Sequence, residues 1–158
     1  MYIDGMIVTA GEKTRLHSGP FGVRRYDAGK CFAGYTLFSP AYGDQEYLID
    51  MRGLVVHTWQ VTHSNVAELL PNGNLFTQNC GRWLEELTPE SQTIWKWDGD
   101  SSLVAPNHHD FWIGNDVVVS LAAIYEPEKP GLFVPGTEPD HLRTDVLLIV
   151  DRKSKKIE

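Results

Sequence analysis

One pattern recurs along the chain, and its first copy reads Ile49-Asp50-Met51-Arg52-Gly53-Leu54-Val55-Val56-His57-Thr58-Trp59. It consists of an apolar run, a polar turn and a strand-like run that closes on tryptophan. The second copy is Leu87-Thr88-Pro89-Glu90-Ser91-Gln92-Thr93-Ile94-Trp95-Lys96-Trp97, and a third begins at Val150 and places Ile157 where Val56 and Ile94 stand. Each copy predicts a β-hairpin, and in the first two copies the second strand carries tryptophan for packing between sheets.

A second element recurs between these copies, at Glu68–Phe76 and again at Asp110–Val118. In the first of them Asn72-Gly73 supplies the positive φ that a tight hairpin needs. Two hairpins in series make about four strands over roughly 40 residues, which is the period of a β-propeller blade. The expected strands of the first blade are 35–38, 47–49 and 54–59, the second blade runs from Val66 to Trp97, and the third starts at His108.

The predicted fold class is therefore all-β, a partial propeller of about two and a half blades over residues 34–158. Residues 1–33 are expected to form an irregular arm, and a Pro/Gly-rich insertion interrupts the third blade at about 126–143. The first blade lacks its inner strand and the third lacks the end of its outer strand. Since open sheet edges favour aggregation, we expect another polypeptide or a missing C-terminal part to complete the ring.

Composition narrows the classes of partner. The formal net charge is −7 and the basic residues are scattered, which argues against nucleic acid. No apolar run approaches the roughly 20 residues of a membrane span, and the start lacks the features of a signal peptide, so a cytoplasmic location is expected. Cys31 and Cys80 are expected to be reduced thiols, without the spacing of a metal site.

The strongest candidate for chemistry is His108-His109-Asp110, at the start of the innermost strand of the third blade. An imidazole there could act as a nucleophile, a general base or a metal ligand. Adjacent residues of a strand point to opposite faces, so one histidine would face the channel while the other packs between blades. The alternative is that both only hydrogen-bond to neighbouring backbone.

Four further residues are candidates for substrate binding. Phe111 and Trp112 follow the histidines and could wall an aromatic pocket, although packing in the core is the simpler interpretation. Asn79 and Arg82 could contact an anionic substrate at the channel end, or lie in a solvated loop. His57 is expected to be structural, and His63 to lie in a solvated loop.

An ordered series of motifs resembles the arylsulfotransferase (aryl-sulfate sulfotransferase) family. The matching stretches are Gly22-Val23, Tyr26-Asp27, Gly34-Tyr35-Thr36-Leu37-Phe38-Ser39-Pro40, Tyr47-Leu48-Ile49-Asp50, Val55-Val56-His57-Thr58-Trp59, Leu69-Leu70-Pro71-Asn72-Gly73-Asn74-Leu75, His108-His109-Asp110-Phe111 and Val134-Pro135-Gly136-Thr137-Glu138. The resemblance implies a six-bladed ring in which a channel histidine accepts a sulfuryl group from an aryl sulfate and passes it to a phenol, without a nucleotide cofactor. It also implies that a second polypeptide supplies the remaining blades and much of the site, and that a periplasmic location is possible.

Two other functions stay open on the same residues. His108 and His109 could serve a hydrolase or lyase that acts on an aromatic or cyclic ketone, and a divalent metal is possible in that case. Alternatively, the blades could form a scaffold without catalytic activity.

Overall fold

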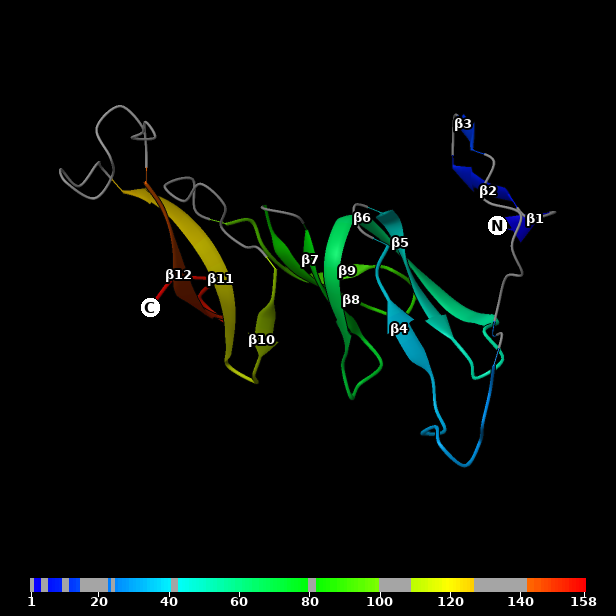
Figure 1. Cartoon of the computed structure of the whole chain (residues 1–158). Helices are drawn as coiled ribbons and strands as arrows, with labels where there is room; N and C mark the ends of the chain where they lie inside the picture. Colours follow the sequence, from blue (N-terminus) through cyan, green and yellow to red (C-terminus); the bar gives the residue numbers. More distant parts are fainter. Residues whose placement is uncertain are drawn as a thin grey trace, which may run out of the picture. The chain divides into compact units, whose positions relative to one another are not determined.

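The computed structural model describes residues 2–3, 6–9, 12–14, 23, 25–40, 43–79, 82–99, 109–126 and 142–158 (Figure 1). In these residues the regular structure consists only of β-strands, so the all-β fold class is confirmed. The predictions that concern His108, Cys80 and residues 127–141 of the insertion lie outside the described residues. No helix within the described ranges has the length and apolar character of a membrane span.

The strands form three antiparallel sheets. The first contains β1 (Tyr2–Ile3), β2 (Met6–Thr9) and β3 (Glu12–Thr14), in that order. The second contains β4 (Thr36–Phe38), β5 (Gly43–Ile49), β6 (Val55–Leu69), β7 (Leu75–Asn79), β8 (Leu84–Leu87) and β9 (Thr93–Trp97), each hydrogen-bonded to the next. The third contains β10 (Phe111–Ile113), β11 (Val117–Glu126) and β12 (Leu142–Asp151). The segment expected to be an irregular arm therefore contains three short strands.

Two compact units divide the chain differently from the predicted boundary at residue 33. The first unit comprises Met1–Thr36 and Leu48–His57, and the second comprises Leu37–Tyr47 and Thr58–Glu158. The core and the site residues described below belong to the second unit.

One expected strand boundary is absent. The sequence predicted a strand at 54–59, a loop that holds His63 and a second blade that starts at Val66, but β6 runs without interruption from Val55 to Leu69. Its register against β7 shifts between Ser64 and Val66, and His63 has a positive φ of 48°. Such a β-bulge takes up one extra residue and bends a strand without ending it.

The polar turns form where the sequence predicted them. Gly73 (φ 86°) donates its backbone N–H to the carbonyl oxygen of Leu70 at 2.9 Å, and Leu70 donates to Asn74 O at 2.8 Å. In the first two copies of the recurring hairpin, a backbone hydrogen bond of 2.9 Å closes the turn. Asp50 N donates to Leu54 O in the first copy, and Thr88 N donates to Gln92 O in the second.

The third copy of that turn is one residue longer. It closes from Asp151 N to Lys156 O at 2.9 Å, and Ile157 forms a bridge with Val150. In the second copy the residue opposite Leu87 is Thr93. Ile157 therefore occupies the place of Thr93 and not that of Ile94, because the extra turn residue displaces the strand by one position. The gapless alignment of the repeats was wrong at this point.

The main core lies between two sheets of the second unit. Its buried members are Phe76, Leu84, Trp97, Val118, Ala122, Leu148 and Val150. Because strand side chains alternate, Phe76 and Gln78 on β7 face β10–β12, whereas Leu75, Thr77 and Asn79 point to the opposite face. All five residues of β7 are buried, since both faces of this strand are covered. Trp97 is buried in this core and Trp95 packs against it, as the repeat predicted.

Candidate functional site

The start of β10 holds the candidate histidine. His109 is exposed and has a φ of 65°, a left-handed conformation that is uncommon for residues other than glycine. Asp110 Oδ1 accepts a hydrogen bond from Phe111 N at 2.8 Å, and Asp110 O accepts one from Leu121 N at 3.3 Å. Strained backbone of this kind is concentrated at functional sites, although it does not by itself assign a function. Since His108 is not described, the choice between the two histidines stays open.

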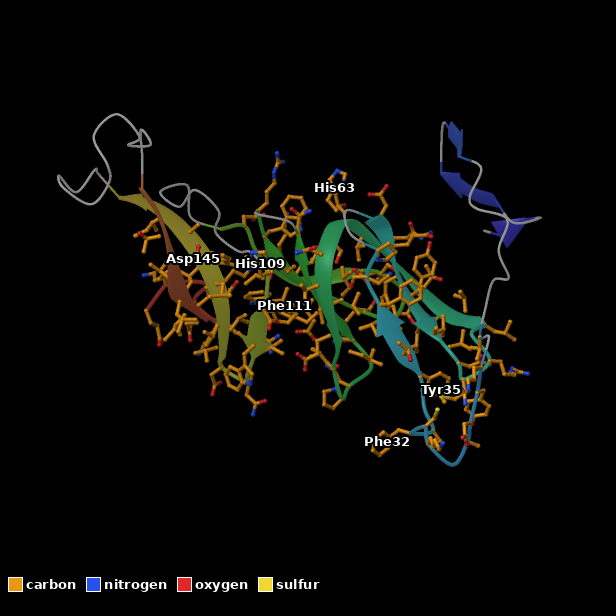
Figure 2. All side chains as sticks on the ribbon, in the orientation of Figure 1. Phe32, Tyr35, His63, His109, Phe111 and Asp145 are labelled. Atoms are coloured by element: carbon orange, nitrogen blue, oxygen red, sulfur yellow. The ribbon has the colours of Figure 1, made fainter. Side chains whose placement is uncertain are left out.

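The two aromatic residues of β10 have different surroundings. Phe111 is half-buried, and its ring centroid lies 5.0 Å from that of Phe76 on β7. Figure 2 shows it beside the middle strands of the second sheet. Trp112 points to the opposite side and is 60% exposed, with its indole over Gly114, where an added Cβ would lie 2.7 Å from Trp112 Cη2. Phe111 thus belongs to the core, and Trp112 presents an open aromatic surface.

Asn79 and Arg82 lie at the end of β7. The Asn79 side-chain amide donates to Thr62 O, and the residue is 3% exposed. Its backbone N donates to Trp83 O at 2.9 Å, while its carbonyl accepts from Arg82 N at 3.3 Å. Asn79 therefore closes the β7–β8 turn onto β6. Arg82 is exposed and keeps its guanidinium at the surface.

These candidates come from two sheets and fall into two groups. His109, Asp110 and Trp112 belong to β10, whereas Asn79 and Arg82 end β7; the ring contact between Phe76 and Phe111 joins the two strands. Of the five, only Asn79 is buried. The exposed histidine, carboxylate, indole and guanidinium together offer a nucleophile or base, an aromatic surface and a cation.

A buried acid that the sequence did not single out lies on β5. Glu46 has no exposed surface, and neither of its carboxylate oxygens has a hydrogen-bond partner of good geometry. Burial raises the pKa of Glu46 above its ordinary value, while the hydroxyls of Ser39 and Ser64 partly oppose that shift. A signal for it exists in the repeat: the positions that match Glu46 in the other two copies are Leu84 and Leu147.

Two hydrogen-bonded hydroxyl groups lie on β6 and β7 of the same sheet, and one of them, on Ser64, affects this acid. Ser64 Oγ lies 2.6 Å from Thr77 Oγ1, and the Thr77 hydroxyl donates to Val66 O at 3.2 Å. A neutral Glu46 carboxyl could donate its proton to a hydroxyl oxygen of this series. An ionised Glu46 carboxylate could only accept a hydrogen bond from one of these hydroxyls. Burial, and not this series, favours the neutral acid at this position.

Beside the bulge, a second histidine lies near a carboxylate. His63 Nδ1 is 3.9 Å from Asp44 Oδ1, and both side chains are largely exposed. Histidine beside aspartate suits general base chemistry. At this distance and exposure, however, the pair contributes little to stability.

Metal-binding potential among the described residues is low. No group of three or more His, Cys, Asp or Glu side chains there could hold a metal ion. Any metal site that uses His108 lies outside these ranges.

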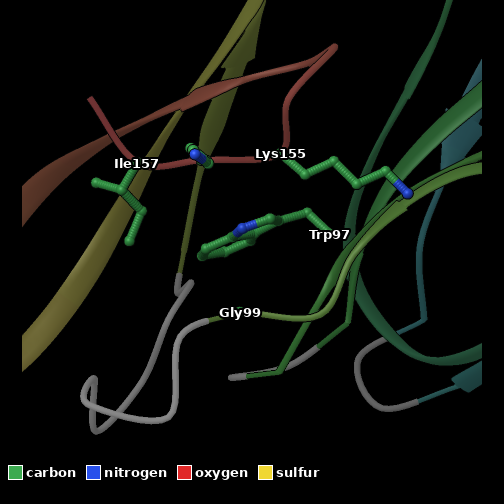
Figure 3. Close-up of a pocket in the computed structure, with 5 residues that line it drawn as sticks. Trp97, Gly99, Lys155 and Ile157 are labelled. Atoms are coloured by element: carbon green, nitrogen blue, oxygen red, sulfur yellow. The ribbon is translucent and has the colours of Figure 1, made fainter.

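An open groove of about 380 Å³ lies beside the turn after β12 (Figure 3). It is lined by Trp97, Gly99, Lys155, Lys156 and Ile157. The lining thus combines one indole ring with two lysine residues.

Comparisons of the chain with protein-family models, with curated proteins and with solved structures found no match. Any function must therefore be argued from the residues and their geometry.

Proposed function

We propose that this chain is part of a propeller enzyme that resembles the arylsulfotransferases and transfers a sulfuryl group from an aryl sulfate to a phenol. The observation that carries the proposal is the position of His109 at the start of β10, the first strand of a repeated antiparallel unit. The last four strands of the six-stranded sheet are β6–β9, and β10, β11, β12 and the bridge at Ile157 follow the same antiparallel order. Propellers place the first strand of each such unit beside the central channel.

The chemistry needs a nucleophile that both accepts and releases the sulfuryl group. In the proposed reaction a neutral imidazole nitrogen attacks sulfur, and the S–O bond to the donor breaks to release a phenolate. The oxygen of the acceptor phenol then attacks the same sulfur, the S–N bond breaks, and the acceptor's proton neutralises the released phenolate. His109, or His108 beside it, is the proposed nucleophile.

One exposed side chain suits an anionic substrate. Arg82, at the end of β7, offers a cation for sulfuryl oxygens. Charge that develops on those oxygens needs several donors. We propose that a second polypeptide supplies the remaining donors together with the remaining blades.

The test is sulfuryl transfer from 4-nitrophenyl sulfate to phenol, measured as release of nitrophenolate by the purified chain with everything that copurifies. His109→Ala and His108→Ala are compared with His57→Ala, a half-buried histidine of β6. We expect one of the first two variants to lose activity by roughly 10²–10⁴-fold and His57→Ala to keep it.

A covalent sulfuryl adduct, trapped with donor alone and located by peptide mass, would identify the nucleophile. Full activity in the double variant His108→Ala/His109→Ala would contradict the proposal. So would a correctly folded protein that transfers from no aryl sulfate, and this result would favour the scaffold. A stoichiometric divalent ion with ketone hydrolysis would favour the hydrolase.

A further inference from the structure

The third sheet carries large apolar side chains on both faces. On one face Val118 and Ala122 of β11 and Leu148 and Val150 of β12 are buried in the core. The other face, called here the outer face, has Trp112, Val119, Leu121, Leu147 and Ile149 at its centre, and the same registers place Val117, Ala123, Asp145 and Asp151 around them. Leu147 is 72% exposed and Trp112 is 60% exposed. A strand pair with apolar residues on both sides is typical of a sheet that is covered on both faces.

The strand registers identify what this outer face corresponds to. On β7 and β8 the cross-strand pairs are Phe76↔Glu86 and Gln78↔Leu84. On β11 and β12 the equivalent pairs, counted along the strands from Val118↔Val150, are Val119↔Ile149 and Leu121↔Leu147. The two registers match because Leu75↔Leu87 in one sheet corresponds to Val118↔Val150 in the other.

Leu84 and Leu147 therefore occupy equivalent positions, yet their exposures are opposite. Leu84 is fully buried because its face packs against the third sheet, whereas Leu147 is 72% exposed. The outer face of the third sheet is thus equivalent to the face of β7 and β8 that packs against the third sheet. What covers it should resemble the core face of β10–β12.

The chain carries a second surface of that kind, on the β4–β5 hairpin. The sequence repeat places Ile49 with Leu87 and Val150, and therefore Tyr47 with Leu148, a member of the core face. The rings of Phe38 and Tyr47 stack with centroids 5.2 Å apart, and Phe38 is 40% exposed. Glu46, the next residue to Tyr47, points the opposite way and is buried.

We propose that a second copy of this chain docks its Phe38–Tyr47 surface on the outer face of the third sheet. The proposal rests on the proposed function in one respect, since it names the polypeptide that supplies further blades as a second copy. The interface is heterologous, because it joins two different surfaces, so it either closes into a ring or extends into a filament. Added salt should strengthen association for two reasons. It favours the burial of the apolar side chains, and it screens the repulsion between copies that each carry a charge of −7.

The test is the mass of the purified chain in solution by light scattering, which does not depend on enzyme activity. We expect wild type to form multiples of 17.8 kDa, and Leu147→Asp and Phe38→Asp each to remain at 17.8 kDa. Ile94→Asp is the matched control, because Ile94 is a 57% exposed strand residue outside both surfaces, and its mass should equal that of wild type. Circular dichroism checks that each variant is folded.

Mixing the two dissociated variants gives the sharper result. The Leu147→Asp chain keeps an intact Phe38–Tyr47 surface, and the Phe38→Asp chain keeps an intact outer face. One intact interface should therefore form, and the mixture should yield a dimer that grows no further. A monomeric wild type, an unchanged mass in either variant, no dimer in the mixture, or a different polypeptide bound in stoichiometric amount would each overturn the proposal. None of these outcomes depends on sulfuryl transfer.

Discussion

At the residue scale, Glu46 has the most unusual environment in the described chain. A carboxyl group without exposed surface and without a hydrogen bond of good geometry occupies a position where the other repeats have leucine. An ionised group at such a position loses its hydration without compensation. The proton that Glu46 binds therefore contributes to the stability of the fold.

The sign of the pH dependence follows from the direction of the shift. Burial raises the pKa of Glu46 in the folded protein above the ordinary 4.5, so the folded state binds this proton more tightly than the unfolded chain. The contribution is complete below pH 4.5 and is lost as pH rises through the folded-state pKa.

Glu46→Gln should consequently raise the free energy of unfolding at pH 7, because the amide is neutral at every pH. The expected gain is about 1–3 kcal/mol, the order of an uncompensated buried polar group, and it should vanish near pH 4. Urea unfolding at both pH values measures it, with the exposed Glu68→Gln as the control. A Gln variant less stable than wild type at pH 7 would show that the carboxylate is needed.

At the element scale, the turns decide which residues face each other. The Asn72-Gly73 turn forms as the sequence predicted, because only a few residue types accept a positive φ. Single-residue differences were not predicted: the turn after β12 is one residue longer than its counterparts, and a bulge joins two expected strands into β6. A gapless comparison of repeats cannot detect such insertions.

Gly73→Ala should lower the free energy of unfolding by about 1–2 kcal/mol, because alanine is strained at a φ of 86°. No atom lies within 4 Å of the position where a Cβ would stand, so the loss reports backbone strain and not a steric clash. Gly73→Asn is the matched control, since asparagine tolerates this conformation better and should lose less. Thermal unfolding compares the two; equal losses would contradict this explanation.

At the scale of the whole molecule, one arginine connects the two sheets of the core. Arg152 follows β12, pairs with Glu86 of β8 and lies over the ring of Trp95, 5.6 Å from its centroid. Its carbonyl oxygen accepts a hydrogen bond from Trp95 Nε1 at 2.7 Å. The Arg152 side chain is only 22% exposed.

Arg152→Ala should lower the free energy of unfolding by about 3 kcal/mol, because it leaves the Glu86 carboxylate buried without its cation. Lys153→Ala, an exposed residue of the same turn, should change little. The double variant Arg152→Met/Glu86→Leu removes both charges and should recover most of the loss. Guanidinium unfolding measures all three, and failure of the double variant to recover would mean that the packing on Trp95 dominates.

The sequence by itself determined the all-β class, the hairpin turns and the tryptophans of the core, since each depends on local alternation or on turn chemistry. It also identified the exposed groups of the candidate site, and their assignment as nucleophile and binding residues stays a prediction.

Only the tertiary structure decided which faces of the strands are covered. Glu46 and Leu147 occupy matching positions of the sequence repeat, yet Glu46 is buried and Leu147 is exposed. Burial depends on which sheet packs against which face, and that packing brings together residues far apart in the chain, such as Arg152 and Glu86.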